Sequence, residues 1–422
     1  MSRQPEGGLV VHGIDFGTST SMIMVGRPGA ASLQIKDPLA ARGEVGVPTS
    51  VCARPDGPLA VGLAAERIKL IHIQNYRTGF KQDIGLPVNY RVGNVTYSPD
   101  GLMAVVLRFL RERALAVVPA EPAAVVLTVP ARWQQWNRDL AIKACVAAGY
   151  DPAVVHLETE PVAALAGLDS LDGTIIIYDL GGGTFDCAVA MPGGAGPEIY
   201  GDPGGLPDVG GRALDDRVLR HVRDTYPQAE QVFAPEVGAG QTDGPDAELL
   251  RRRIGLREKC TEAKIELSDA ELTEKLLTDL DPPEILRMDR AALERAIADL
   301  VDLTVQECAR MLADLGLTHA EVGHLLQIGG SSHIPFTTER LAASFGRPVR
   351  VAEEPDLAVV RGAAELALRI AAPPPPPVLE AAPSPATPDD EAAAVPAAKT
   401  PVQPTEKLRH FDPNRNLFCE DE

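Results

Sequence analysis

The chain has 422 residues, and its 40 lysine and arginine side chains are outnumbered by 59 aspartate and glutamate side chains, which gives a formal charge of −19. This length predicts two domains or one large two-lobed domain. The hydrophobic fraction of 45% is ordinary for a folded protein and excludes wholesale disorder. The acidic balance argues against a general binder of nucleic acid or of an anionic membrane, because both need a basic face.

Cysteine usage and the apolar runs favour a cytoplasmic location. No two cysteines form a CxxC pair, so the sequence contains no zinc knuckle and no redox motif. Cysteines this sparse suit a reducing compartment. The N-terminal residues do not resemble a signal peptide, and no run approaches the roughly 18 apolar residues of a membrane span. We therefore expect a cytoplasmic protein with neither a nucleic-acid nor a membrane partner.

Strand-like and helix-like segments alternate through residues 1–372, which predicts an α/β fold. The apolar run Val125–Val129 predicts a buried strand, helical spacing follows at Asn137–Ala148, and Ile175–Tyr178 predicts a second buried strand. Further along, Met288–Leu315 predicts one or two amphipathic helices. Their buried stripe is expected to contain Leu293, Ile297, Leu300, Leu303 and Val305.

Residues 373–422 have a different composition, because 12 of these 50 residues are proline. They begin with five consecutive prolines, which favour an extended polyproline helix and cannot continue an α-helix. Little in this segment could form a core, so we expect a disordered tail. Its last residues include Phe411, Leu417 and Phe418, and they predict either a solvated chain end or a docking motif for an unidentified protein partner.

Two segments share one pattern, in which an apolar run leads into Asp-x-Gly and is followed by a second apolar run. They are GIDFGTSTS at Gly13–Ser21 and IIIYDLGGGTFDCAVA at Ile175–Ala190, with Asp15 and Asp179 in equivalent places. The pattern predicts a strand, a glycine turn and a second strand, once in each half of the chain.

Such turns are suited to binding phosphate. Glycines let the main chain approach a ligand, and successive N–H groups form an anion-binding nest. Hydroxyl groups at Thr18, Ser19 and Thr184 add donors, and an aspartate at a strand end can hold Mg²⁺ through its waters. The alternative is that Gly181–Gly183 is a tight hairpin turn and nothing more. The sequence contains neither a Gly-Lys dipeptide nor a G-x-G-x-x-G after a strand, which excludes two other phosphate loops.

A third glycine turn, Gly329-Gly330, follows the apolar run Leu325–Ile328 and precedes a predicted helix start at Pro335. Beside two phosphate hairpins, it is a candidate contact for adenosine.

Six motifs now resemble the nucleotide-binding domain of the DnaK-type heat-shock protein 70 chaperones, which belong to the actin-like ATPase superfamily. In family order they are GIDFGTSTS, VVLTVPARW with Arg138, ETEPVAALAGLD, YDLGGGTFD, EAKIELS and IGGSSHIP. The resemblance implies a two-lobed α/β fold with a duplicated mixed sheet. Lobe I would span about residues 10–165, lobe II about 173–355 and a closing helix about 356–372, with Mg-ATP between the lobes.

The resemblance also implies roles for matching residues. The first phosphate loop would be Asp15, Gly17, Thr18 and Ser19, and the second Asp179, Gly181, Gly182, Gly183 and Thr184. Mg²⁺ would be held, largely through water, by Asp15, Asp179 and Asp186. The catalytic residues would be Lys81, Glu160, Asp179 and Thr184. The remaining nucleotide contacts would be Gly211, Lys264, Ser268, Gly329, Gly330, Ser331, His333 and Asp356.

Two of these assignments have simple structural alternatives. Lys81 could be a solvated surface lysine. Glu160 could be a helix N-terminal acid, which the helix dipole favours before Pro161.

The sequence also departs from the family. The family's client-binding domain has no counterpart in the tail, so client folding by this chain alone is not expected. Arg212 and Ala213 stand where the family has acidic residues, which predicts the loss of a carboxylate near the nucleotide, and Thr261, His333 and Leu357 are further changes. They fall mainly on the adenosine side and predict altered affinity more than altered phosphate chemistry.

The leading functional hypothesis is a slow Mg-ATPase whose lobes switch conformation with nucleotide state and so control a partner. The alternative is a catalytically weak nucleotide-binding scaffold or sensor. A third hypothesis is a helper chaperone that holds clients through the tail.

Overall fold

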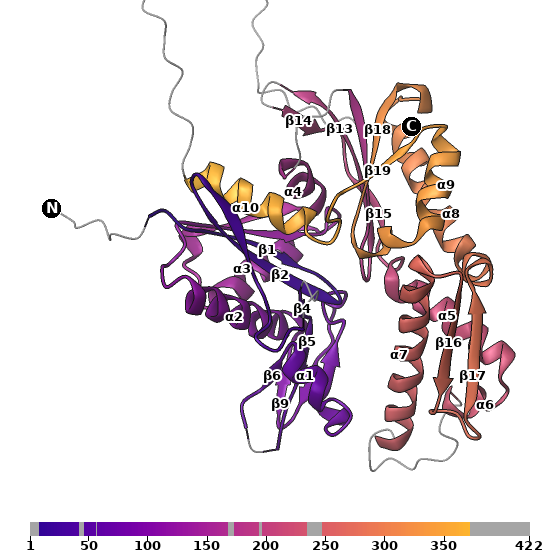
Figure 1. Cartoon of the computed structure of the whole chain (residues 1–422). Helices are drawn as coiled ribbons and strands as arrows, with labels where there is room; N and C mark the ends of the chain where they lie inside the picture. Colours follow the sequence, from indigo (N-terminus) through magenta and orange to yellow (C-terminus); the bar gives the residue numbers. More distant parts are fainter. Residues whose placement is uncertain are drawn as a thin grey trace, which may run out of the picture. The chain divides into compact units, whose positions relative to one another are not determined.

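Two mixed β-sheets form the framework of the structure (Figure 1). The first has the strand order β11-β10-β1-β2-β3, with β4 paired to β2. Its strands are β1 Val11–Phe16, β2 Thr20–Arg27, β3 Ala30–Ile35, β4 Val47–Pro48, β10 Ala124–Val129 and β11 Val155–Thr159. The second has the order β14-β13-β12-β18-β19, with β15 paired to β13. Its strands are β12 Thr174–Leu180, β13 Phe185–Gly193, β14 Gly196–Ile199, β15 Gly204–Leu206, β18 Val322–Ile328 and β19 Val349–Val351.

The computed structural model describes residues 8–41, 46–55, 57–167, 173–193, 196–233 and 247–371, all within one unit, Met1–Pro374. We call the part built on the first sheet lobe I (described residues between 8 and 167) and the part built on the second sheet lobe II (described residues between 173 and 351). The predictions for residues 373–422, including the docking motif around Phe411, Leu417 and Phe418, fall outside the described residues.

Helices and short hairpins surround the two sheets. The α-helices of the described residues are α1 Leu63–Ile68, α2 Pro99–Val117, α3 Gln135–Ala147, α4 Glu160–Ala166, α5 Gly211–Thr225, α6 Gln228–Phe233, α7 Ala247–Asp269, α8 Arg290–Asp314, α9 Pro335–Phe345 and α10 Ala358–Ala371. The 3₁₀ turns are η1 Ile73–Asn75, η2 Pro152–Val154, η3 His319–Glu321 and η4 Gly330–His333. The remaining strands are β5 Ser50–Cys52, β6 Ala60–Val61, β7 Tyr76–Thr78, β8 Tyr90–Val92, β9 Val95–Tyr97, β16 Leu272–Leu277 and β17 Glu284–Asp289.

The two sheets repeat one topology around a central hairpin. In lobe I, β1 pairs antiparallel with β2 and parallel with β10, and β10 pairs parallel with β11. In lobe II, β12 pairs antiparallel with β13 and parallel with β18, and β18 pairs parallel with β19. The α/β class, the duplicated mixed sheet and the two strand–glycine turn–strand hairpins predicted from the sequence are therefore confirmed.

The elements predicted from apolar patterns are present, with one error. Both predicted buried strands are found, as β10 and β12, and the C-terminal amphipathic segment is one helix, α8. On that helix Leu303 is 45% exposed and does not belong to the buried stripe. At 3.6 residues per turn, the buried residues Leu300, Ile297 and Val305 lie at about −20°, 40° and 120° of rotation relative to Leu293. Leu303 lies at about −80°, outside this sector. No helix among the described residues is long and apolar enough to cross a membrane.

Small residues let the two sheets share one apolar cluster. Buried alanines of α4 and α10 pack in it with side chains from β1, β10, β12 and β18. A Cβ atom built on Gly362 of α10 would lie 1.5 Å from the backbone oxygen of Ala163 in α4. A Cβ on Gly13 of β1 would lie 2.2 Å from the backbone nitrogen of Ala364. These approaches are closer than any other residue allows, so glycine is required at both places.

We expect Gly362→Ala to lower the free energy of unfolding by about 1–3 kcal/mol, because the added methyl group must push α10 away from α4. Thermal or denaturant unfolding measures the change. Gly57→Ala is the matched control, since a Cβ there meets only the Arg54 side chain, at 3.7 Å. Equal stability of the two variants would contradict this account of the packing.

Candidate functional site

A pocket of about 590 Å³ lies between the two lobes, a size typical of small-ligand sites. Its walls come from the β1–β2 turn, the β12–β13 turn, α7, η4 and the segment before α10. Every residue predicted for the site lines this pocket except Gly183 and Asp186. Asp186 is 3% exposed, and its charge interacts with Glu160 and Lys81 of the pocket.

The two glycine turns face each other across the pocket. A Cβ built on Gly183 would lie 2.6 Å from the hydroxyl oxygen of Thr18, and one on Gly182 would lie 2.7 Å from that of Ser19. The second hairpin therefore presents glycine backbone to the hydroxyl side chains of the first. The structure brings together the turns that the sequence placed about 160 residues apart.

Backbone and hydroxyl contacts hold both turns in place. In the first turn, the Thr49 hydroxyl donates to the carbonyl of Gly17 at 2.9 Å. In the second, the amide of Gly181 donates to the carbonyl of Thr184 at 3.0 Å. The first residues of α5 then donate to the same turn, from the Gly211 amide to the Gly181 carbonyl at 2.9 Å. The start of α5 is thus tied to the second turn.

The floor of the pocket is a buried ion pair. The Lys81 ammonium lies 2.8 Å from Oε1 of Glu160, and the two residues are 5% and 6% exposed. Burial by itself would lower the pKa of Lys81, but Glu160 and Asp15 outweigh it and raise the pKa. Glu160 also begins α4, with Pro161 in its first turn, so it is a helix N-terminal acid as well. The surface position considered for Lys81 is wrong.

Carboxylates outnumber the cation in this buried region. Burial, with a contribution from the Glu160 charge, raises the pKa of Asp15 to about 6 and that of Asp186 to about 7. Burial and the same neighbour raise the pKa of Asp179 well above its usual value. Four acids therefore surround Lys81, and a buried charge excess of this kind needs a further cation or protons.

A hydrated divalent cation fits this surplus of acids. Among the described residues, no group of three or more His, Cys, Asp or Glu side chains is placed to ligate a metal directly. Mg²⁺ commonly keeps several waters and uses only one or two carboxylates. The acid cluster around Asp15, Asp179 and Asp186 suits a cation held in that way.

The opposite wall carries a second ion pair that the sequence did not reveal. The Lys264 ammonium lies 2.8 Å from Asp215 and donates to the carbonyl of Gly211 at 3.0 Å. Asp215 follows Gly211 by four residues on α5 and lines the pocket. Arg212 and Ala213 stand where the family has acidic residues, but Asp215, one helical turn further along α5, still brings a carboxylate to the pocket. In the sequence, the indication of this contact was that Asp215 follows Gly211 by four residues, a spacing that places both residues on one face of a helix.

The third glycine turn completes the pocket beside the second. Gly329 has φ of 84°, and a Cβ on it would lie 2.5 Å from Oδ1 of Asp179. The Ser331 hydroxyl donates to the Gly181 carbonyl at 3.3 Å. At the rim, Nε2 of His333 lies 3.2 Å from Oδ2 of Asp356, and both side chains are partly exposed. Further lining residues not predicted from the sequence include Thr20, Met22, Ile265, Asp269, Ile334, Pro355 and Val359.

The duplicated sheets with paired glycine turns over a buried acid cluster define an actin-like ATPase fold. The family model described as Hsp70 protein matches residues 81–372, and the chain belongs to this chaperone family.

Relatives named chaperone protein DnaK extend the match. The one from Methanothermobacter thermautotrophicus is 32% identical over 366 residues, which cover 83% of this chain and 58% of the relative. Those from Thermosipho melanesiensis and Thermosipho africanus are 28% and 27% identical over 369 residues, 84% of this chain and 58% of each relative. The chain thus spans somewhat more than half the length of these relatives.

The raised pKa of Asp186 predicts a pH-dependent stability in chelator without nucleotide. The unfolded carboxyl loses its proton near pH 3.8 and the folded one near pH 7, so rising pH through this window destabilises the folded state. Asp186→Asn removes the titration. We therefore expect the melting temperature of the variant, relative to the parent, to be higher at pH 8 than at pH 5.

Asp208→Asn, at an exposed position, is the control and should show no such trend. A constant difference between Asp186→Asn and the parent from pH 5 to pH 8 would show that Asp186 does not hold a proton in this window.

Proposed function

We propose that the pocket binds ATP or ADP with Mg²⁺, and that the chain slowly hydrolyses ATP to ADP and phosphate. The observation that carries the proposal is the meeting of two glycine turns in one pocket with the buried Lys81–Glu160 pair. Membership of the Hsp70 family supports it.

The phosphates would be bound by the two turns. Backbone N–H groups of the turns and the hydroxyls of Thr18, Ser19 and Thr184 offer donors from both lobes. Bound Mg²⁺ would neutralise phosphate charge. Asp15, Asp179 and Asp186 would hold its waters, and their raised pKa values show how strongly this region favours added positive charge.

Hydrolysis needs a positioned water and charge stabilisation more than covalent chemistry. Glu160 and Asp15 keep Lys81 protonated, so the ammonium can offset charge that develops on the transferred phosphoryl group. Glu160 accepts a hydrogen bond from Lys81 at 2.8 Å through Oε1, and its second oxygen is available to orient a water. Thr184 adds a hydroxyl at the second turn.

The nucleoside would lie on the α7 side of the pocket. Ile265 lines the pocket and is 60% exposed, so it offers an apolar surface to a base. The polar contacts would come from the third turn, from α5, from α7 and from the segment before α10. They are Gly211, Lys264, Ser268, Gly329, Gly330, Ser331, His333 and Asp356.

The second candidate function is a nucleotide-binding scaffold or sensor with almost no turnover. The paired state of Lys264 and the contact between His333 and Asp356 favour it, because a nucleoside must compete with carboxylates for these donors. Under either function we propose a cytoplasmic protein whose lobe conformation controls a protein partner, with no nucleic-acid or membrane partner. We propose the lobes at about residues 10–165 and 173–355, the closing helix at about 356–372, and the tail as one route to the partner.

Lys81→Ala is expected to reduce ATP turnover by about 100-fold or more, because it removes the cation that offsets transition-state charge. Binding of Mg-ATP should remain, since the glycine turns are unchanged. Single-turnover phosphate release and an equilibrium titration measure the two properties. Lys143→Ala, at an exposed position of α3, is the matched control. Turnover at the parent rate in Lys81→Ala would show that Lys81 has no catalytic role.

The two candidate functions are separated by loading the parent with Mg-ATP, removing free nucleotide and following what stays bound. Conversion to ADP identifies an ATPase, whereas persistent ATP identifies a scaffold or sensor. If an equilibrium titration shows no nucleotide binding, both candidates are wrong.

A further inference from the structure

Arg212 connects the two lobes inside the pocket. Its backbone amide donates to the Gly182 carbonyl of the second turn at 2.9 Å. Its side chain reaches lobe I, where Nη2 donates to the hydroxyl of Thr78 at 3.0 Å. Thr78 ends β7 in lobe I. One residue of lobe II therefore touches its own phosphate turn and the opposite lobe.

The guanidinium fits a place that only a glycine leaves open. Gly79 has φ of 76°, and a Cβ built on it would lie 1.8 Å from Nη1 of Arg212. A side chain at position 79 would therefore displace Arg212. Gly79 precedes Lys81 by two residues, so the contact lies on the segment that carries the buried ammonium.

A second contact fixes the same segment, which we call the lysine segment, residues 78–82. The side-chain Nε2 of Gln82 donates to the Gly183 carbonyl at 3.1 Å. Between these two contacts, Lys81 pairs with Glu160. On one side of Lys81, Arg212 holds Thr78, and on the other side the Gly183 carbonyl of the second turn holds Gln82. Arg212 is itself bonded to the second turn.

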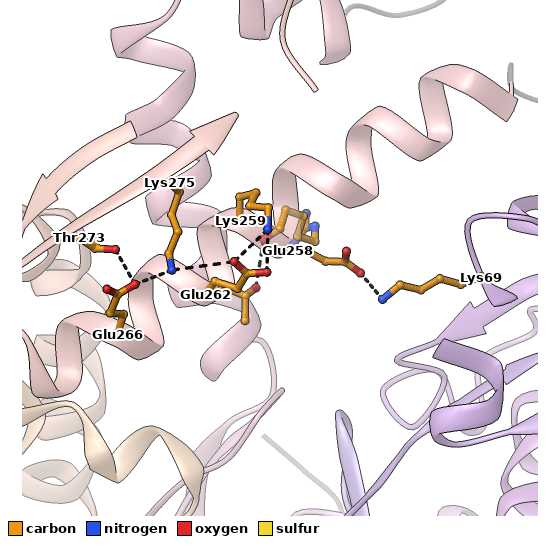
Figure 2. Close-up of polar contacts among 9 residues, drawn as sticks. Lys69, Glu258, Lys259, Glu262, Glu266, Thr273 and Lys275 are labelled. Carbon is orange, nitrogen blue, oxygen red and sulfur yellow. Dashed lines mark hydrogen bonds and ion pairs between the residues drawn. The ribbon is translucent and has the colours of Figure 1, made fainter. Parts of the chain in front are cut away.

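Two other polar contacts between the lobes lie outside the pocket lining. Figure 2 shows Lys69, next to α1, paired with Glu258 of α7. Nearby, Nε of Arg251 donates to the carbonyl of Leu70 at 2.7 Å. Neither contact involves the lysine segment or a glycine turn. Among these bridging arginine and lysine side chains, only Arg212 also lines the pocket.

We propose that Arg212 is a positioning residue that ties the lysine segment to the second glycine turn. Opening the pocket must break the bond from Arg212 to Thr78 and release the lysine segment in the same step. Lys81 is therefore held in place only while the lobes are closed. The effect on nucleotide release rests on the proposed function, but the restraint on the lysine segment does not.

The first test measures amide hydrogen exchange of the lysine segment in the full chain without ligand. Arg212→Gln should speed exchange by roughly five- to tenfold, the effect of losing one hydrogen bond. Thr78→Val should act similarly, and the double variant should exchange no faster than the faster single variant. Thr78→Ser should exchange like the parent because it keeps the hydroxyl.

Arg287→Gln is the matched control, because Arg287 pairs with Glu274 at 2.8 Å within the β16–β17 hairpin of lobe II. The melting temperature of Arg212→Gln should fall by no more than about 2 °C, the effect of one hydrogen bond in a domain of this size, which separates a local restraint from general destabilisation. The proposal would be overturned if the lysine segment of Arg212→Gln exchanged at the parent rate. It would also be overturned if the rate increase in the double variant equalled the product of the increases in the two single variants.

The second test measures release of fluorescent ADP. Arg212→Gln should release it several-fold faster, while Arg287→Gln should match the parent. If the parent binds no nucleotide, the proposed function fails and the exchange result still decides the role of Arg212. If Arg212→Gln weakens binding without changing exchange, Arg212 is a ligand contact and the positioning proposal is wrong.

Discussion

The buried charge of the pocket is the constraint on which the rest of the site depends. Its acids are divided between the lobes: Asp15 and Glu160 belong to lobe I, and Asp179 and Asp186 belong to lobe II. Closing the pocket buries these groups and brings like charges together, and burial first and Glu160 second raise the pKa of Asp179. Lys81 offsets only part of this repulsion. A bound cation would attract both sets of acids, so cation binding and lobe closure should favour each other.

The contacts between the lobes divide into two groups with different consequences. Lys69 and Glu258 meet away from the pocket lining, so a ligand in the pocket does not contact them. The contacts of the lysine segment with Arg212 and Gly183 lie beside the pocket, because Arg212 and Lys81 both line it. Ligand chemistry and lobe closure therefore act on the same few side chains.

Local sequence patterns were sufficient for the framework of this site. The glycine turns, their aspartates and the buried strands are each encoded within a few residues, and the resemblance located Lys81 and Glu160. Patterns could not show that Lys81 and Glu160 form a buried pair, because they are 79 residues apart and only the fold brings them together. Arg212 looked like the loss of an acid, but its position depends on Gly79 in the other lobe. Leu303 was grouped with the buried stripe although helical rotation carries it beyond the sector that the other four residues occupy.

The contact between α4 and α10 has a consequence for how the lobes can move. Gly362 of α10 meets the backbone of Ala163, and Gly13 of β1 meets the backbone of Ala364, so α10 is seated directly on elements of lobe I. The chain just before α10 is bonded to lobe II, because the Gly329 amide donates to the carbonyl of Pro355 at 3.3 Å. A change of lobe angle must therefore be absorbed in the few residues between Pro355 and the start of α10, which serve as a hinge between the lobes.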